Sequence, residues 1–222
     1  MSRACSAAVE LITDFPTVEA ARAAVEPYLQ AWEIQSLVDH LAKHSDFSQP
    51  LRFEYHSAEV SNAQPTDLTV HVNPGHHYIE GEFPSPPSRL LASPDVRLMW
   101  QRWESYQAGR ESLPAMAYYC LTALEAATGK SRNDRRSSAA AAYAVDIEVL
   151  NQLGDLVSEV GDDHERRKAH AKHRRPYTTT EKEWIERVVL ALIERVGRVA
   201  CGNATGTNIS LRTLTLGDLP AI

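Results

Sequence analysis

The residue types best suited to chemistry gather in residues 162–175, where carboxylates, histidines and cations are interspersed. A histidine can exchange a proton with the 2′-hydroxyl or the 5′-oxygen of an RNA backbone, and an arginine can stabilise the charge that develops on the phosphorus. Within this stretch Arg167 and His173 form the candidate catalytic pair, with His170 as an alternative to His173. These residue types suit cleavage of RNA without a metal ion.

Two other interpretations of the stretch stay open. Cations that follow the end of a helix complement its dipole and remain hydrated, so a solvated basic loop is the plainer interpretation. A metal site would use His170 and His173, three positions apart, together with Asp162, Asp163 or His164. Because the neighbouring cations would repel a divalent ion, we predict neither a metal site nor a cofactor.

Charge is unevenly distributed along the chain. Residues 164–175 carry a net charge of +5 and residues 130–136 carry +3, against −6 for the whole chain of 222 residues. A basic spot on an acidic body attracts anionic partners locally, so we expect these segments to bind RNA or another polyanion. The predicted binding residues are Lys130, Arg132, Arg135, Arg136, Arg166, Arg167, Lys168, Lys172, Arg174 and Arg175.

Searches for other catalytic arrangements fail. The sequence has no Gly-x-Ser-x-Gly motif and no Walker loop, and Cys120 falls in an apolar helical pattern where a thiol is normally buried and inert. Three cysteines that lie far apart in the sequence favour a reducing compartment. With no apolar run of about 20 residues and no signal-peptide pattern, we expect a cytoplasmic protein that does not enter a membrane.

The N-terminal region begins with a helical pattern. Residues 1–16 carry little pattern of their own, and Thr17 can then cap a helix. Pro27 should bend or interrupt this helix, because proline lacks a main-chain donor and its ring clashes with the preceding turn. A second apolar stripe continues from there to Leu41 with roughly helical spacing.

Extended patterns follow. Residues 51–55 alternate between apolar and polar side chains, residues 68–72 are rich in β-branched side chains, and residues 77–83 could return as a third strand after a turn. Short strands with tight connections favour a small antiparallel sheet. Three prolines within residues 84–88 exclude a helix or a central strand and mark a linker.

Everything after the linker has helical periodicity. Pro94 opens the first expected helix, Ser112 caps the second, and a long third helix begins at Ser137 or Ser138. The apolar stripe of the third helix is Tyr143, Ile147, Leu150, Leu153, Val157 and Val160. A capping box that starts at Thr180 opens the last helix. Short loops between such one-sided helices predict an antiparallel four-helix bundle.

Residues 93–200 resemble the HEPN superfamily of small helical bundles. The likeness rests on a Tyr- and Leu-rich helix pair, a long third helix, an Arg/His loop and the sequence Tyr177-Thr178-Thr179-Thr180-Glu181 that opens the last helix. Active members are metal-independent ribonucleases, and the resemblance implies that role for Arg167 and His173, with Lys168 at the position next to the arginine. The whole chain also resembles uncharacterised bacterial proteins, which implies no activity.

These observations predict an α+β protein. Residues 1–83 form an N-terminal helix and a small antiparallel sheet, residues 84–92 a Pro-rich linker, residues 93–200 the four-helix bundle and residues 201–222 a C-terminal tail that adds a strand, docks in a groove or stays loose. The favoured function is a non-catalytic module that presents its basic segments to RNA or another polyanion. A ribonuclease and a protein-interaction or regulatory module are the alternatives, and a homodimer through a bundle face is consistent with the pattern.

Overall fold

The computed structural model describes residues 7–10, 15–43, 53–60, 68–74, 86–129, 131, 134–161, 175–207 and 209–222. Within these ranges, residues 42 and 43 and the strands are described by their backbone, and only Phe53 of the strands has a described side chain. The chain divides into two compact units, Met1–Ala92 and Ser93–Ile222.

The first unit is built on one long helix, α1 (Val18–Lys43). Its start follows the expected cap, because Thr17 Oγ1 accepts a hydrogen bond from Ala20 N at 3.1 Å. The expected interruption at Pro27 is wrong, since the helix continues through this residue. Proline leaves the carbonyl four residues earlier without its helical donor. That carbonyl belongs to Ala23, which is exposed, so water can bind it.

Three extended segments of the first unit pair in an antiparallel sheet with the order β1-β3-β2. They are β1 (Ala7–Glu10), β2 (Phe53–Val60) and β3 (Leu68–Pro74). In register, Val70 of β3 lies opposite Val9 of β1 and Ala58 of β2. β3 matches the strand expected at residues 68–72, β2 overlaps the strand expected at residues 51–55 and continues to Val60, and the expected strand at residues 77–83 lies outside the described residues. β1 falls where the sequence showed little pattern.

Aromatic packing joins α1 to the start of β2. The ring centroid of Trp32 lies 6.3 Å from that of Tyr28 and 5.1 Å from that of Phe53. Glu33 is buried, and its Oε1 accepts a hydrogen bond from Phe53 N at 2.7 Å. A buried carboxylate needs such a donor, so this bond helps to fix where β2 begins along α1.

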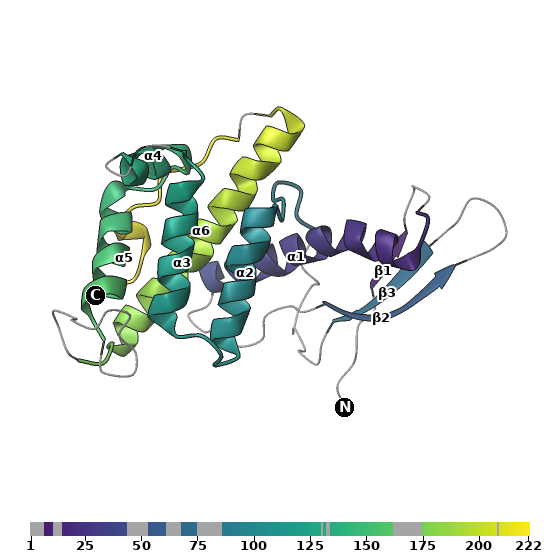
Figure 1. Ribbon diagram of the computed structural model, residues 1–222, viewed down its shortest axis with the longest axis horizontal. Coiled ribbons are helices and arrows are strands. Elements are labelled where there is room, and N and C mark those ends of the chain that lie inside the picture. Colours follow the sequence, from purple (N-terminus) through teal and green to yellow (C-terminus); the bar gives the residue numbers. More distant parts are fainter. Residues whose placement is uncertain are drawn as a thin grey trace. The chain divides into compact units, whose positions relative to one another are not determined.

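In the residues that the structure describes, the second unit is a bundle of five helices (Figure 1). They are α2 (Pro94–Gln107), α3 (Leu113–Ala126), α4 (Arg135–Ala142), α5 (Ile147–Glu159) and α6 (Thr179–Thr205), and a short 3-10 turn, η1 (Leu216–Asp218), follows them. α3 packs against each of the other four helices. The largest fully buried side chains include Trp100, Trp103, Met116, Leu121, Leu150, Leu153 and Trp184. The core of this unit therefore surrounds α3.

The expected α+β class is wrong. In the part of the chain whose side chains are described, the protein is all-α, because six helices make up 70% of it and no sheet forms part of it. Fold class depends on which elements build the core rather than on the presence of extended backbone. The buried hydrophobic side chains that the structure describes lie on helices or on the segments that connect them.

The expectation of four helices is also wrong, because the long third helix is two helices. α4 ends at Ala142, α5 begins at Ile147, and Ala144 between them has a φ of 51°, a left-handed conformation unusual for a residue other than glycine. Asp146 caps α5, since its Oδ1 accepts a hydrogen bond from Glu148 N at 3.1 Å. Ile147, expected in the core, is 40% exposed at the first position of α5, whereas Leu150, Leu153 and Val157 of the same stripe are buried.

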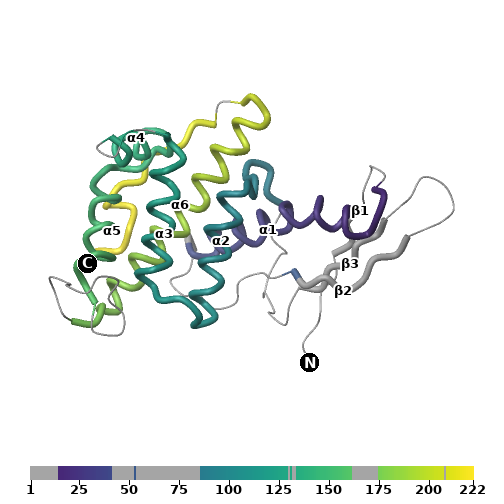
Figure 2. Tube along the Cα trace, viewed as in Figure 1, coloured from purple at the N-terminus to yellow at the C-terminus, as the bar shows by residue number. Residues whose placement is uncertain are grey.

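The C-terminal segment, residues 209–222, docks on the bundle, one of the three outcomes that the sequence left open. α6 ends at Thr205, and Gly206 follows it in the left-handed conformation of a helix C-cap. Figure 2 traces the segment from the end of α6 back to the side of α5, where Leu214 forms a parallel bridge with Val145. No helix among the described residues is long and apolar enough to cross a membrane.

Candidate functional site

Most of the predicted site lies outside the described residues. This holds for the candidate catalytic residues Arg167, His173 and His170 and for the binding residues Lys130, Arg132, Arg166, Lys168, Lys172 and Arg174. The structure places three members of the predicted set, Arg135, Arg136 and Arg175. These three flank the basic segments, so they show how the bundle holds the ends of each segment.

The two basic segments connect different helices of the bundle. The first segment joins α3 to α4, and the second follows α5 and leads into α6 (Figure 1). Their described ends contact α5 at different places. Arg136 reaches Asn151 in the middle of α5, whereas Tyr177 reaches the carbonyls of Leu156 and Val160 at its C-terminal end.

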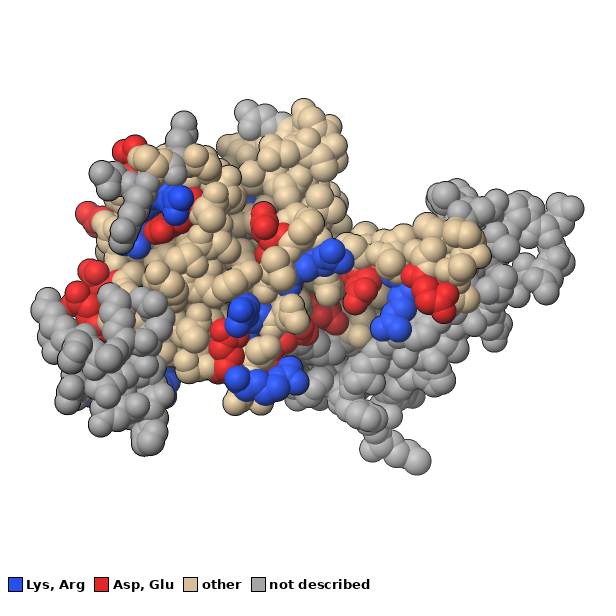
Figure 3. All heavy atoms as spheres, viewed as in Figure 1, with Lys and Arg blue, Asp and Glu red and all other residues tan. Residues whose placement is uncertain are grey.

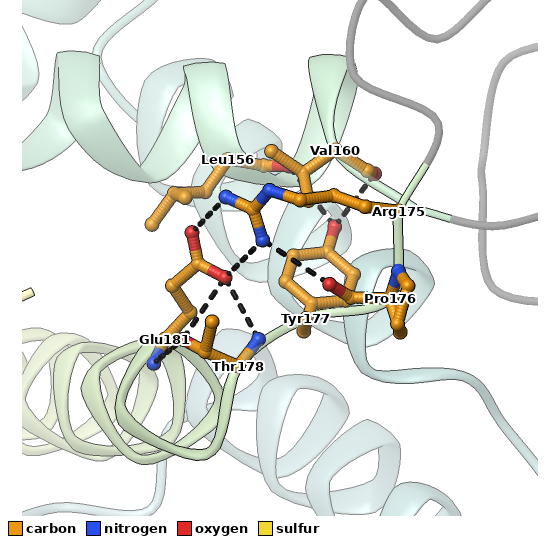
Figure 4. A network of polar contacts seen from close by, with 7 residues as sticks. All are labelled: Leu156, Val160, Arg175, Pro176, Tyr177, Thr178 and Glu181. Carbon is orange, nitrogen blue, oxygen red and sulfur yellow. Dashed lines mark hydrogen bonds and ion pairs between the residues drawn. The ribbon is translucent and has the colours of Figure 1, made fainter.

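Glu181 at the start of α6 holds Arg175 (Figure 4). Arg175 Nη1 donates to Glu181 Oε2 at 2.7 Å and Nη2 donates to Oε1 at 2.6 Å, a two-pronged geometry that is specific to the guanidinium group. Nη1 also donates to the carbonyl of Pro176 at 3.1 Å. The positive charge of Arg175 is therefore matched within the chain.

The same carboxylate completes the N-cap of α6. Glu181 Oε2 accepts a hydrogen bond from Thr178 N at 2.8 Å, and Thr178 Oγ1 accepts one from Glu181 N at 3.1 Å. The expected capping box at Thr180 is wrong by two residues, because the N-cap is Thr178. The hydrogen bonds from Arg175, and then those from Thr178, lower the pKa of Glu181 to about 2.

Tyr177 fastens the second basic segment to α5. Its hydroxyl lies 2.9 Å from the carbonyl oxygen of Leu156 and 3.0 Å from that of Val160, at the C-terminal end of α5, and the residue is buried (Figure 4). A buried hydroxyl that donates to the end of another helix fixes the distance between the two backbones. The described chain that resumes at Arg175 is therefore fixed, through Tyr177, to the end of α5 that precedes residues 162–174.

Arg136, at the start of α4, is also paired. Its Nε donates to Glu125 Oε1 at 2.7 Å and its Nη1 donates to Asn151 Oδ1 at 3.2 Å. A Cβ on Gly154 would lie 3.1 Å from both terminal nitrogens of Arg136, so this glycine leaves the space that the guanidinium group occupies. The side chain thus bridges α3, α4 and α5.

The described surface is mixed in charge rather than uniformly basic. Arg135 is exposed on α4. On the face that Figure 3 draws, most of the described surface is uncharged, and the atoms of lysine and arginine lie next to those of aspartate and glutamate in several places. Neighbouring charges of opposite sign cancel within about a Debye length, so this described face presents no continuous basic surface to a polyanion.

Two further ionisable contacts tie the bundle helices together. The Tyr106 hydroxyl of α2 donates to Glu186 Oε1 of α6 at 2.6 Å, and burial raises the pKa of Glu186. Arg102 lies over the ring of Tyr119, 4.6 Å from its centroid, and pairs with Glu111 at 3.1 Å. Both contacts join residues of different elements, so we assign them a role in stabilising the bundle.

Cys120 is completely buried in α3, as its apolar pattern predicted. Burial, and then the nearby charge of Glu111, raises the pKa of the Cys120 thiol. A protonated thiol without access to solvent is a poor nucleophile. Among the residues that the structure describes, no three His, Cys, Asp or Glu side chains gather as a metal ion would require, and the histidines and carboxylates considered for a metal from the sequence lie outside them.

The sequence did not single out two residues that organise the ends of the basic segments. Tyr177 follows a proline at the end of a polar stretch, and an isolated aromatic residue at such a place is a usable signal for an anchor. Glu125 gave no signal, because its partner Arg136 is 11 residues away and meets it only after α3 and α4 have packed.

Comparison with known proteins identifies no relative of this chain, because no family model, curated protein or solved structure matches it. The resemblance of residues 93–200 to HEPN bundles therefore stays an expectation drawn from the sequence.

Proposed function

We propose that this protein is a non-catalytic binding module that presents residues 162–174 to RNA or another polyanion. The observation that supports the proposal is the fastening of this segment at its ends. Tyr177 joins the return of the segment to the last carbonyls of α5, and the pair of Arg175 and Glu181 joins it to α6. A basic segment of 13 residues thus begins and ends at fixed points on a packed bundle.

Fixed ends favour binding because they reduce the chain entropy that is lost when a partner orders the segment. The three carboxylates of the segment, Asp162, Asp163 and Glu165, all precede its cations. Residues 166–174 include no carboxylate and carry a net charge of +5. Its cations are Arg166, Arg167, Lys168, Lys172 and Arg174. Each cation that contacts a phosphate releases counterions, which supplies affinity without reading the sequence of the nucleic acid.

Two ion pairs reduce the number of arginines that we expect to contact the polyanion. Arg175 is matched by Glu181 and Arg136 by Glu125, so both already have a stabilising role inside the bundle. The segment of residues 130–136 joins α3 to α4, away from the C-terminal end of α5. We therefore place the principal contact with the polyanion on residues 166–174 and a weaker one on residues 130–135.

The test is binding of a fluorescent single-stranded RNA, followed by anisotropy in EDTA at low salt. The variant Lys168→Gln/Lys172→Gln removes two cations from the segment, and Arg97→Gln/Arg110→Gln removes two exposed cations from α2 and the loop after it. We expect the first pair to weaken binding at least about fivefold and the second less than about twofold, because only the first removes phosphate contacts. No binding by the wild-type chain, or equal losses in both variants, would contradict the proposal.

A denaturing gel of the same samples separates binding from ribonuclease activity. The proposal predicts that the RNA stays intact after binding. Cleavage in EDTA that disappears in both Arg167→Ala and His173→Ala would instead establish a metal-independent ribonuclease with an arginine and a histidine in the roles that the sequence suggested. If neither RNA nor an acidic polysaccharide binds, the partner is a protein, and the basic segment is incidental.

A further inference from the structure

A second feature of the bundle is the way the C-terminal segment attaches to the corner between α4 and α5. Leu214 forms a parallel bridge with Val145. Asp146 N donates to the carbonyl of Leu214 at 2.8 Å, and Leu214 N donates to the carbonyl of Ala144 at 2.9 Å. The corner therefore binds the segment as a sheet edge binds an added strand, through main-chain groups that any extended peptide also has.

Arg195 of α6 lies between the corner and the segment. Its Nη1 donates to the carbonyls of Tyr143 and Ala144 at 3.1 and 2.7 Å, and its Nη2 donates to the carbonyl of Arg212 at 2.8 Å. One guanidinium group thus holds the corner in its left-handed conformation and also binds a carbonyl of the docked chain. That carbonyl lies two residues before the leucine that the corner accepts.

One side chain of the segment is buried against the bundle. Leu214 is 8% exposed and lies beside Val145, which is also buried, whereas Ile222 is 50% exposed. The remaining described residues of the segment are half-buried or exposed. The contacts of Asp218 with Arg212 and Thr215 connect the segment to itself rather than to the helices. The described attachment thus consists of one buried aliphatic anchor, the guanidinium group of Arg195, the side chain of Ile209 over Gly202 and a few main-chain hydrogen bonds.

We propose that the corner Tyr143–Asp146 together with Arg195 is a docking site for an extended peptide, and that the C-terminal segment is an exchangeable strap that occupies it. The partner that fits is an extended segment of another protein, with an aliphatic side chain at the place of Leu214 and a free carbonyl two residues before it. These are the features by which the C-terminal segment itself binds the corner. Gly206, in the left-handed conformation of a helix C-cap, ends α6 shortly before the strap begins.

The test uses full-length chains and a fluorescent peptide of residues 209–220 as the probe. Leu214→Asp removes the anchor from the resident strap and leaves the corner intact, so we expect it to bind the peptide at least tenfold more tightly than the wild-type chain. Adding Arg195→Ala to this chain should abolish binding. Adding Arg198→Ala, which alters an arginine that pairs with Glu194 on the same helix, should leave it unchanged.

Failure of the peptide to bind a folded Leu214→Asp chain, or equal binding to this chain and the wild type, would overturn the proposal. Hydrogen exchange of the wild-type chain tests the same idea without a variant. We expect the amides of Leu214 and Asp146 to exchange at similar rates, at least tenfold faster than that of Leu153 in the core of α5, because the strap opens locally. Exchange as slow as that of Leu153 would show that the segment is a permanent part of the fold.

Discussion

Glu181 combines three contacts that usually fall to separate residues. Its carboxylate accepts hydrogen bonds from both terminal nitrogens of Arg175 and from the main-chain N–H of Thr178, and the main-chain N–H of Glu181 donates to the Thr178 hydroxyl. One carboxylate therefore caps α6 and also holds the residue at which the basic segment ends. Loss of its charge should loosen the helix start and the segment together.

This coupling makes the stability of the protein sensitive to acid. The pKa of Glu181 is lowered from 4.5 to about 2, so its stabilising contribution is complete above pH 4.5 and is lost as the pH falls toward 2. We expect Glu181→Gln to lower the denaturation midpoint at pH 7 and to flatten the decline between pH 4.5 and 2, as urea titrations can measure. Thr178→Ala should cost about 1 kcal/mol at pH 7 through loss of the cap. An unchanged acid profile in Glu181→Gln would contradict this assignment.

Glu186 should behave in the opposite way. Burial raises its pKa, so the contribution of this group to stability is greatest at low pH and is lost as the pH rises through its folded-state pKa. Glu186→Gln removes the charge and keeps an oxygen that can accept the Tyr106 hydrogen bond. We expect the variant to be more stable than the wild type at pH 7 and to lose that advantage at pH 4. Urea unfolding of both proteins at pH 7 and pH 4 measures this difference in stability. A Glu186→Gln variant that is less stable than the wild type at pH 7 would refute the prediction.

At the scale of elements, Gly154 allows three helices to share one arginine. Glycine inside a helix normally costs about 0.5–1 kcal/mol relative to alanine. Here a Cβ would lie 3.1 Å from both terminal nitrogens of Arg136, which would have to move away from Asn151. We expect Gly154→Ala to stabilise the protein by about that amount only when Arg136 is already alanine. In a double-mutant cycle of unfolding free energies, additive effects of the two substitutions would contradict this coupling.

Local signals in the sequence predicted the elements well where the structure depends on local contacts. The start of α1 after Thr17, the start of α2 at Pro94 and the N-cap position of Ser112 before α3 follow from residue types next to each helix end, but the Ser112 side chain makes no capping hydrogen bond. The apolar stripe of α6, with Trp184 and Ile185 at its start, is buried as its spacing predicts.

The sequence failed where distant parts of the chain decide the local structure. The break between α4 and α5 depends on Arg195, which binds the carbonyls of Tyr143 and Ala144 from another helix, and on Leu214 from the tail. No residue at the break is a glycine or a proline, so the continuous apolar stripe predicted one long helix. The pairs that hold Arg136 and Arg175 likewise required the three-dimensional structure, whereas the charge of residues 166–174 was visible in the sequence alone.

At the scale of the whole molecule, the second unit uses the two ends of its bundle differently. At one end of α5, Tyr177 and Glu181 fasten the most basic segment of the chain. At the other end, the corner of α4 and α5 binds the C-terminal segment. On the face that Figure 3 draws, positive and negative side chains lie next to each other, so we expect a polyanion to engage the first end rather than this face.

The most direct test of the account is the salt dependence of RNA binding. For single-stranded RNA, the slope of log K against log salt is about −0.7 for each phosphate contact, so the five cations of residues 166–174 predict a slope no steeper than about −3.5. Replacing all five with glutamine should bring the slope close to zero while the helical circular dichroism stays unchanged. If that variant binds RNA with the slope of the wild type, the contact lies elsewhere on the molecule and the account is wrong.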